Sequence, residues 1–96
     1  MMQFADLTFE ETKSFPQGVI SVVRFGEYDL SVIRNEISYG YKQGLYEIGV
    51  FKGDDMVELP GITEQGDAVK GWLTEHEVSS VMKKLYFMTR SDPVQL

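Results

Sequence analysis

Cysteine is absent from this chain of 96 residues, and histidine, tryptophan and proline are scarce. Without cysteine there is no disulfide framework, no thiolate zinc site and no cysteine nucleophile. Long apolar runs are also absent, so no segment is expected to span a bilayer. The N-terminus lacks the basic segment and apolar core of a signal peptide. We therefore expect a cytoplasmic protein that neither enters a membrane nor is secreted by that route.

Positive charge is also in short supply. Nine basic residues stand against fifteen acidic ones, which gives a net charge of −6, so the electrostatic basis of nucleic-acid affinity is missing and direct binding is not expected. The acidic residues concentrate in one segment, residues 53–77, which contains a single lysine, Lys70, among Asp54, Asp55, Glu58, Glu64, Asp67, Glu75 and Glu77. Such a segment either keeps a protein in solution or docks a basic partner.

No motif with a catalytic or metal-binding pattern is present. His76 is the only histidine, and on a helix its two glutamate neighbours would diverge from it by about 100° per residue. We interpret it as an exposed residue of a first helical turn. Asp54, Asp55 and Glu58 lack the spacing of a calcium loop, and the glycines do not form a phosphate-binding motif. We expect no catalytic residue, no metal, no cofactor and no enzymatic activity.

Short apolar-alternating segments separated by glycine-containing turns dominate residues 19–59. The pattern predicts strands over residues 19–25, 28–35, 45–52 and 56–59. The first has apolar residues on both faces, which indicates a strand covered on both sides. For the first fifteen residues two alternatives remain: a helix from Thr8 to about Ser14, or an edge strand through Phe4 and Leu7.

A helix near the C-terminus has the strongest local signals. Thr74 and Glu77 form a capping box, and Leu73 and Val78 are placed for a hydrophobic staple across it. Apolar residues then recur at helical spacing and form one stripe, Val78, Val81, Met82, Leu85 and Met88, before Pro93 ends the helix. The sequence thus predicts one α+β domain over residues 1–96, with an antiparallel sheet of about four strands and this amphipathic helix on one face.

Several aromatic and glycine residues lie outside this pattern. Trp72 precedes the helix and is expected to seal the core at the end of the sheet. Gly49 lies inside a predicted strand, which favours a bulge over a close backbone approach. Tyr39 and Tyr41, in a loop rich in glycine and tyrosine, are either half-buried turn residues or contact residues for a partner.

Four segments carry a resemblance to a group of proteins: LSVIR at residues 30–34, SYG at 38–40, GLYEIGV at 44–50 and GWLTEHEV at 71–78. Together they resemble small uncharacterised proteins encoded by tailed bacteriophages and prophages, over residues 18–88. The resemblance brings no active site. It implies a setting, the cytoplasm of a bacterial host, in which such proteins often bind a host or phage protein.

Binding of a protein partner is therefore favoured over catalysis. The residues expected to contact it are Asp54, Asp55, Glu58, Tyr39 and Tyr41. Two alternatives stay open: an inhibitor that mimics DNA with its acidic segment, and a structural phage component that assembles as a homo-oligomer.

Overall fold

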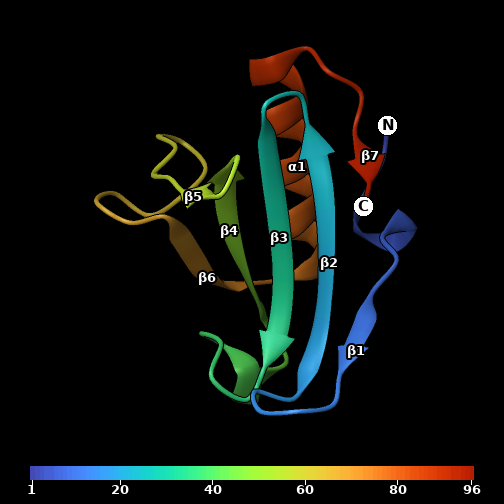
Figure 1. Ribbon diagram of the computed structural model, residues 1–96, viewed down its shortest axis with the longest axis vertical. Coiled ribbons are helices and arrows are strands. Elements are labelled where there is room, and N and C mark those ends of the chain that lie inside the picture. The colour runs from blue at the N-terminus through green and yellow to red at the C-terminus, as the bar shows by residue number, and fades with distance from the viewer.

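Three long antiparallel strands form the centre of the structure, a computed structural model of residues 1–96 (Figure 1). They are β2 (Gly18–Phe25), β3 (Tyr28–Asn35) and β4 (Tyr46–Lys52). Branched apolar residues at alternating positions favour strands, because their side chains pack well on a pleated surface. Phe25 pairs directly with Tyr28, so a two-residue turn, Gly26-Glu27, joins β2 to β3.

Four short strands widen this centre to a sheet of seven strands, not the predicted four or so. β1 (Glu10–Thr12) and β7 (Val94–Gln95) both pair with β2. β5 (Asp55–Met56) and β6 (Val69–Leu73) both pair with β4. The strand predicted over residues 56–59 is thus reduced to β5. β1 and β7 were not predicted because strands of two or three residues are too short to show alternation. β6 was not predicted because its pairing with β4 is irregular.

Neither alternative for the first fifteen residues is fully right. A short 3₁₀ helix, η1 (Phe4–Asp6), comes first, and the edge strand β1 follows it. No helix forms from Thr8 to Ser14. The edge strand begins after Leu7, because Phe4 and Leu7 pack against the core instead of joining the sheet. The Phe4 ring contacts that of Tyr46, with 4.9 Å between the ring centroids.

The helix α1 (Glu75–Thr89) begins with the predicted capping box. The Glu77 N–H donates to Thr74 Oγ1 at 3.1 Å, and the Thr74 N–H donates to Glu77 Oε1 at 3.0 Å. Leu73 and Val78, on either side of the cap, are both buried. The helix ends before Pro93, at Arg90, whose left-handed φ of +52° stops further helical bonds.

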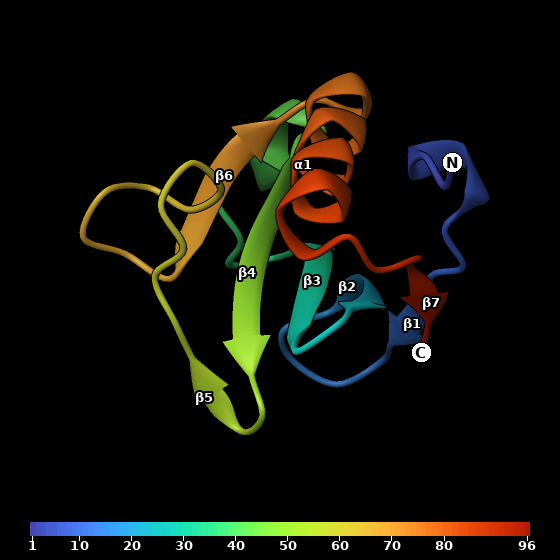
Figure 2. The same ribbon diagram turned by 90° about the horizontal axis from the view of Figure 1, so that it is seen from above.

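The core lies between α1 and one face of the sheet, as Figure 2 shows from above. Four of the five residues in the predicted stripe are buried there, namely Val78, Val81, Met82 and Leu85. They pack with buried side chains of the sheet, among them Val23, Phe25, Leu30, Val32, Ile48 and Val50. Met88 is 51% exposed, because the last helical turn lies beside Glu27 and Tyr28 at the β2–β3 turn and not over the core. α1 is neither long nor apolar enough to cross a membrane.

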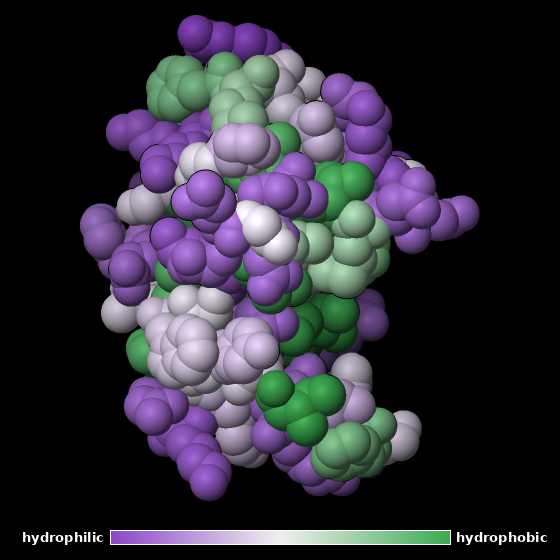
Figure 3. All heavy atoms as spheres, turned by 90° about the vertical axis from the view of Figure 1, so that its left-hand side faces the viewer, coloured by the Kyte–Doolittle hydropathy of each residue, from purple (hydrophilic) through white to green (hydrophobic).

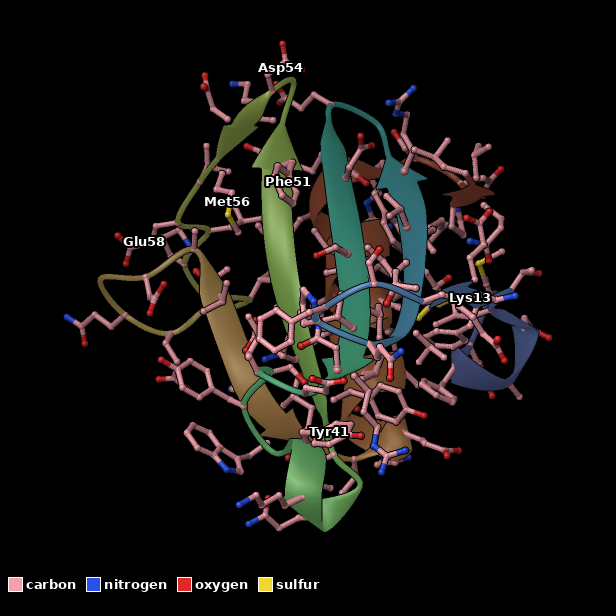
Figure 4. The ribbon with its side chains drawn as sticks, turned by 60° about the horizontal axis from the view of Figure 1, so that its bottom comes forward. Lys13, Tyr41, Phe51, Asp54, Met56 and Glu58 are labelled. Atoms are coloured by element: carbon pink, nitrogen blue, oxygen red, sulfur yellow. The ribbon has the colours of Figure 1, made fainter.

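No helix covers the opposite face of the sheet. Ile20 and Val22 of β2 are half-buried there, so the prediction that residues 19–25 are covered on both sides is wrong. Figure 4 shows Phe51 and Met56 on this face, with α1 behind the sheet. A Cβ atom on Gly49 would lie 3.2 Å from the Met56 methyl carbon. Gly49 therefore marks a close side-chain approach, not the predicted bulge.

The side chain of Gln95 joins both ends of the chain to β2. Its Oε1 accepts from the Thr8 N–H at 2.8 Å, and its Nε2 donates to Ser21 Oγ at 3.0 Å and to the Val22 carbonyl at 3.0 Å. One amide group therefore satisfies three polar groups on two segments, the residues before β1 and the middle of β2.

The capping box predicts a measurable pH effect. Hydrogen bonds from the Thr74 backbone N–H, and then from its side chain, lower the pKa of Glu77 below its ordinary value of 4.5. Because the folded pKa lies below the unfolded one, this stabilisation is present above pH 4.5 and is lost as pH falls through the lowered pKa. Glu77→Gln should therefore flatten the decline of the denaturation midpoint in acid. Glu75→Gln, in the same turn, is the control, and equal curves for both variants would contradict the expectation.

Candidate functional site

The five predicted contact residues do not form one surface. Figure 4 shows Asp54 and Tyr41 at opposite ends of the sheet, with Glu58 in the loop that follows β5. Tyr39 lies with Tyr41 in the loop after β3, which contains the 3₁₀ helix η2 (Tyr41–Gln43). The acidic and the aromatic candidates are therefore two separate regions.

The acidic region includes the tip of the β4–β5 hairpin. Lys52 pairs with Asp55, so the turn is formed by Gly53 and Asp54, and both aspartates are exposed. Two ion pairs lie at the same end of the sheet, Lys52 with Glu27 at 3.2 Å and Arg24 with Asp29 at 2.8 Å. The hydrogen bond that each of these two cations donates to its carboxylate partner raises the pKa of the cation. Asp54 and Asp55 form no ion pair of their own.

Three other carboxylates of residues 53–77 hold backbone amides in place. Glu58 Oε2 accepts from the Gly66 N–H at 2.6 Å, and Asp67 Oδ1 accepts from the Ala68 N–H at 2.7 Å. Glu77 caps α1, which begins at the end of the sheet opposite the hairpin tip. Figure 3 shows hydrophilic atoms across this side of the molecule, and hydrophobic ones along the margin where the open sheet face begins. The acidic segment is thus spread over both ends and does not form one continuous row.

The aromatic region is built on a stacked pair, Tyr39 and Trp72, which we name the aromatic platform. The two rings lie 4.9 Å apart between centroids, at an interplanar angle of 20°. Tyr39 is 52% exposed and Trp72 is 56% exposed. The prediction that Trp72 seals the core is therefore wrong, since the buried residue at this end of β6 is its neighbour Leu73.

A bulge in β6 explains why Trp72 faces solvent. Leu73 pairs with Tyr46 and Lys70 pairs with Ile48, so Gly71 and Trp72 together oppose the single residue between them on β4. Trp72 has a φ of +54°, a left-handed conformation that is rare for a bulky residue. The bulge lets Leu73 enter the core while the indole points outward.

The Tyr39 ring lies against Gly71, the neighbour of Trp72. The Trp72 ring lies against Gly40, the neighbour of Tyr39. A Cβ atom on Gly71 would lie 2.3 Å from Tyr39 Cβ, and one on Gly40 would lie 3.1 Å from Trp72 Cα. Gly40 also has a φ of +91°, which favours glycine. The Trp72 N–H donates to the Tyr39 carbonyl at 3.3 Å. Backbone contacts therefore fix both residues at this point.

A groove of about 260 Å³ runs along the platform. Its lining comes from the loop after β3 and from β6, and consists of Glu36, Ile37, Ser38, Tyr39, Gly40, Tyr41, Lys42, Gln43 and Trp72. Tyr41 is half-buried, and the Arg34 guanidinium lies over its ring at 5.4 Å. Ser38 Oγ forms two hydrogen bonds with the Asn35 backbone in a turn. It donates to the Asn35 carbonyl at 3.0 Å and accepts from the Asn35 N–H at 2.9 Å.

The groove combines aromatic ring faces with one carboxylate, Glu36, and one ammonium group, Lys42. A second carboxylate, Glu47, lies outside the lining and contacts Tyr39. Glu47 Oε1 accepts from the Tyr39 N–H at 2.9 Å. His76 is exposed in the first turn of α1, as predicted. Nowhere in the structure do three or more histidine, aspartate or glutamate side chains gather as metal ligands would.

Sequence reasoning identified Tyr39 but missed its stacking partner. The signal that was available is the dipeptide pair Tyr39-Gly40 and Gly71-Trp72, in which an aromatic residue stands next to a glycine twice. Only the pairing of β6 with β4 shows that the two dipeptides meet.

Comparison with protein families, with curated proteins and with solved structures found no match to the chain.

Proposed function

We propose that this chain is a non-enzymatic protein that acts by binding a protein partner through the aromatic platform. The observation that supports this is the exposure of two stacked rings at a rigid position. Tyrosine and tryptophan are enriched in protein interfaces because they offer a large contact area at a low entropic cost. A single tryptophan at the centre of a contact often carries much of the binding energy.

The backbone of Trp72 supports the same proposal. A non-glycine residue in the left-handed region costs on the order of 1–2 kcal/mol. The bulge offsets this cost by burying the neighbouring Leu73, and the same conformation places the indole in solvent. A binding surface thereby gains a fixed aromatic face.

Asp54 and Asp55 have a secondary role in the proposal. They lie far from the platform, so they act through the electric field of the whole chain, whose net charge is −6. Such a field speeds the approach of a basic partner and makes the association rate depend on salt. We place this partner in a bacterial cytoplasm, as a host or phage protein.

Capture of the partner by matched variants tests the proposal. Trp72→Gly removes the ring and keeps a residue that adopts a positive φ easily, so folding should be unaffected or slightly improved. Affinity for the captured partner should fall by about 30-fold or more, the effect of losing a hot-spot residue. Binding is measured with the purified partner after capture by the wild-type chain.

Phe87→Ser is the matched control, because Phe87 is an exposed aromatic residue on α1 and not part of the platform. It should retain full affinity. The proposal fails if Trp72→Gly binds the partner as well as the wild type does. If the captured molecule is a second copy of this chain, a sizing column will show a dimer that Trp72→Gly dissociates.

A further inference from the structure

The cations of the chain cover several of its aromatic rings but not the platform. Arg34 lies over Tyr41 at 5.4 Å, Arg90 over Phe87 at 5.2 Å and Lys52 over Tyr28 at 6.0 Å, measured to the ring centroids. No such cation lies over Tyr39 or Trp72, although both are about half exposed. A ring face attracts a cation placed within about 6 Å of its centroid, and tryptophan attracts it best. The platform is thus an exposed, stacked aromatic face with no cation of the chain over it.

Negative charge stands beside these open faces. Glu36 is exposed at the rim of the groove and forms neither a salt bridge nor a side-chain hydrogen bond. Glu47 uses Oε1 for the Tyr39 N–H, at 2.9 Å, which leaves its second oxygen available. Lys42 also lines the groove, where its charge offsets that of Glu36. The excess of negative charge near the platform comes from Glu47, which contacts Tyr39 from outside the groove, and it has the same sign as the net charge of −6.

We infer that the platform binds the guanidinium group of an arginine in a basic segment of the partner protein. The planar guanidinium stacks on the exposed ring face and donates to the Glu36 carboxylate. A nucleic-acid base is disfavoured because its phosphates would meet an acidic chain. A proline-rich segment would cover the rings but offer the Glu36 carboxylate neither a positive charge nor a hydrogen-bond donor. This assignment rests on the proposed function and names the chemistry of the partner.

Trp72 is the only tryptophan, so its fluorescence reports on the platform alone. The experiment titrates the full chain with a glycine-rich peptide that has arginine at alternate positions. A matched peptide carries citrulline, which keeps the shape and removes the charge. The arginine peptide should change the Trp72 emission in a saturable way, and the citrulline peptide should bind about 3- to 30-fold more weakly, from the cation–π and ion-pair contributions together.

Variants locate the charge contribution. Glu36→Gln should weaken binding of the arginine peptide by about two- to fivefold and reduce its dependence on salt. Glu64→Gln, an exposed carboxylate that forms no salt bridge, should change neither. Equal affinity for the arginine and citrulline peptides, tighter binding of a proline-rich peptide, or no emission change with arginine would each overturn the assignment. The proposed function is judged separately, by whether Trp72→Gly loses affinity for the captured partner. That result does not depend on the peptide titrations.

Discussion

Leu85→Ala should lower the free energy of unfolding by about 2–5 kcal/mol, the range for removing a buried leucine from a core. Leu85 is 0% exposed and lies on the face of α1 that packs against the sheet. Domains of this size are stable by roughly 5–15 kcal/mol, so the loss is a large share of the total. Urea denaturation should show a lower midpoint with an unchanged slope.

Met88→Ala is the control, because Met88 belongs to the same helical stripe in the sequence but is half exposed. It should cost less than about 1 kcal/mol, as substitutions at partly exposed sites usually do. Equal midpoint shifts for the two variants would mean that α1 does not pack on the sheet through Leu85.

Gly71→Ala should destroy the aromatic platform. The new methyl group would lie 2.3 Å from Tyr39 Cβ, and a Cβ atom cannot rotate away, so the backbone of the loop or of β6 must shift. We expect a destabilisation of about 1–3 kcal/mol from the overpacking. We also expect a changed Trp72 emission and a loss of partner affinity as large as that of Trp72→Gly, about 30-fold or more.

Gly49→Ala is the matched control on the neighbouring strand. Its methyl group would lie 3.1 Å from Ser31 Oγ and 3.2 Å from the Met56 methyl carbon, and the methionine side chain is flexible enough to yield. Emission and partner affinity should stay as in the wild type. If Gly71→Ala retains both as well, the absence of a side chain at Gly71 is not what positions the rings.

The sequence was sufficient for elements whose signals are local. The capping box of Thr74 and Glu77 lies within one turn, and the alternation in β2, β3 and β4 extends over seven or eight residues. Such signals do not depend on the rest of the fold, so the helix, the central strands and the α+β class were predicted correctly. Pro93 indicates only where the helix cannot continue, and the helix ends earlier, at Thr89, because the backbone of Arg90 is left-handed.

The remaining strands depend on contacts between distant segments. β7 contains two residues and is held by pairing with β2 and by the side chain of Gln95. β6 contains a glycine and a bulge, which interrupt the alternation that predicts a strand. The number of strands was therefore underestimated.

The candidate site was predicted only in part, for the same reason. Tyr39 stands in a loop with an obvious excess of tyrosine and glycine, whereas Trp72 precedes a helix, where an aromatic residue usually packs inward. Its orientation is decided by the register of β6 against β4, which no local pattern contains. The acidic segment was visible in the sequence, but its division between backbone caps and free carboxylates was not.

The glycine contacts of the platform also have a kinetic consequence. Immobilising a flexible side chain on binding costs about 0.5–1.5 kcal/mol, but the rings of Tyr39 and Trp72 are already stacked and held by the backbone hydrogen bond between them. A ligand that meets them need not wait for a loop to rearrange, so the free and bound chains should share one shape. Ligands of this surface should then differ in affinity mainly through how long they stay, not through how fast they arrive.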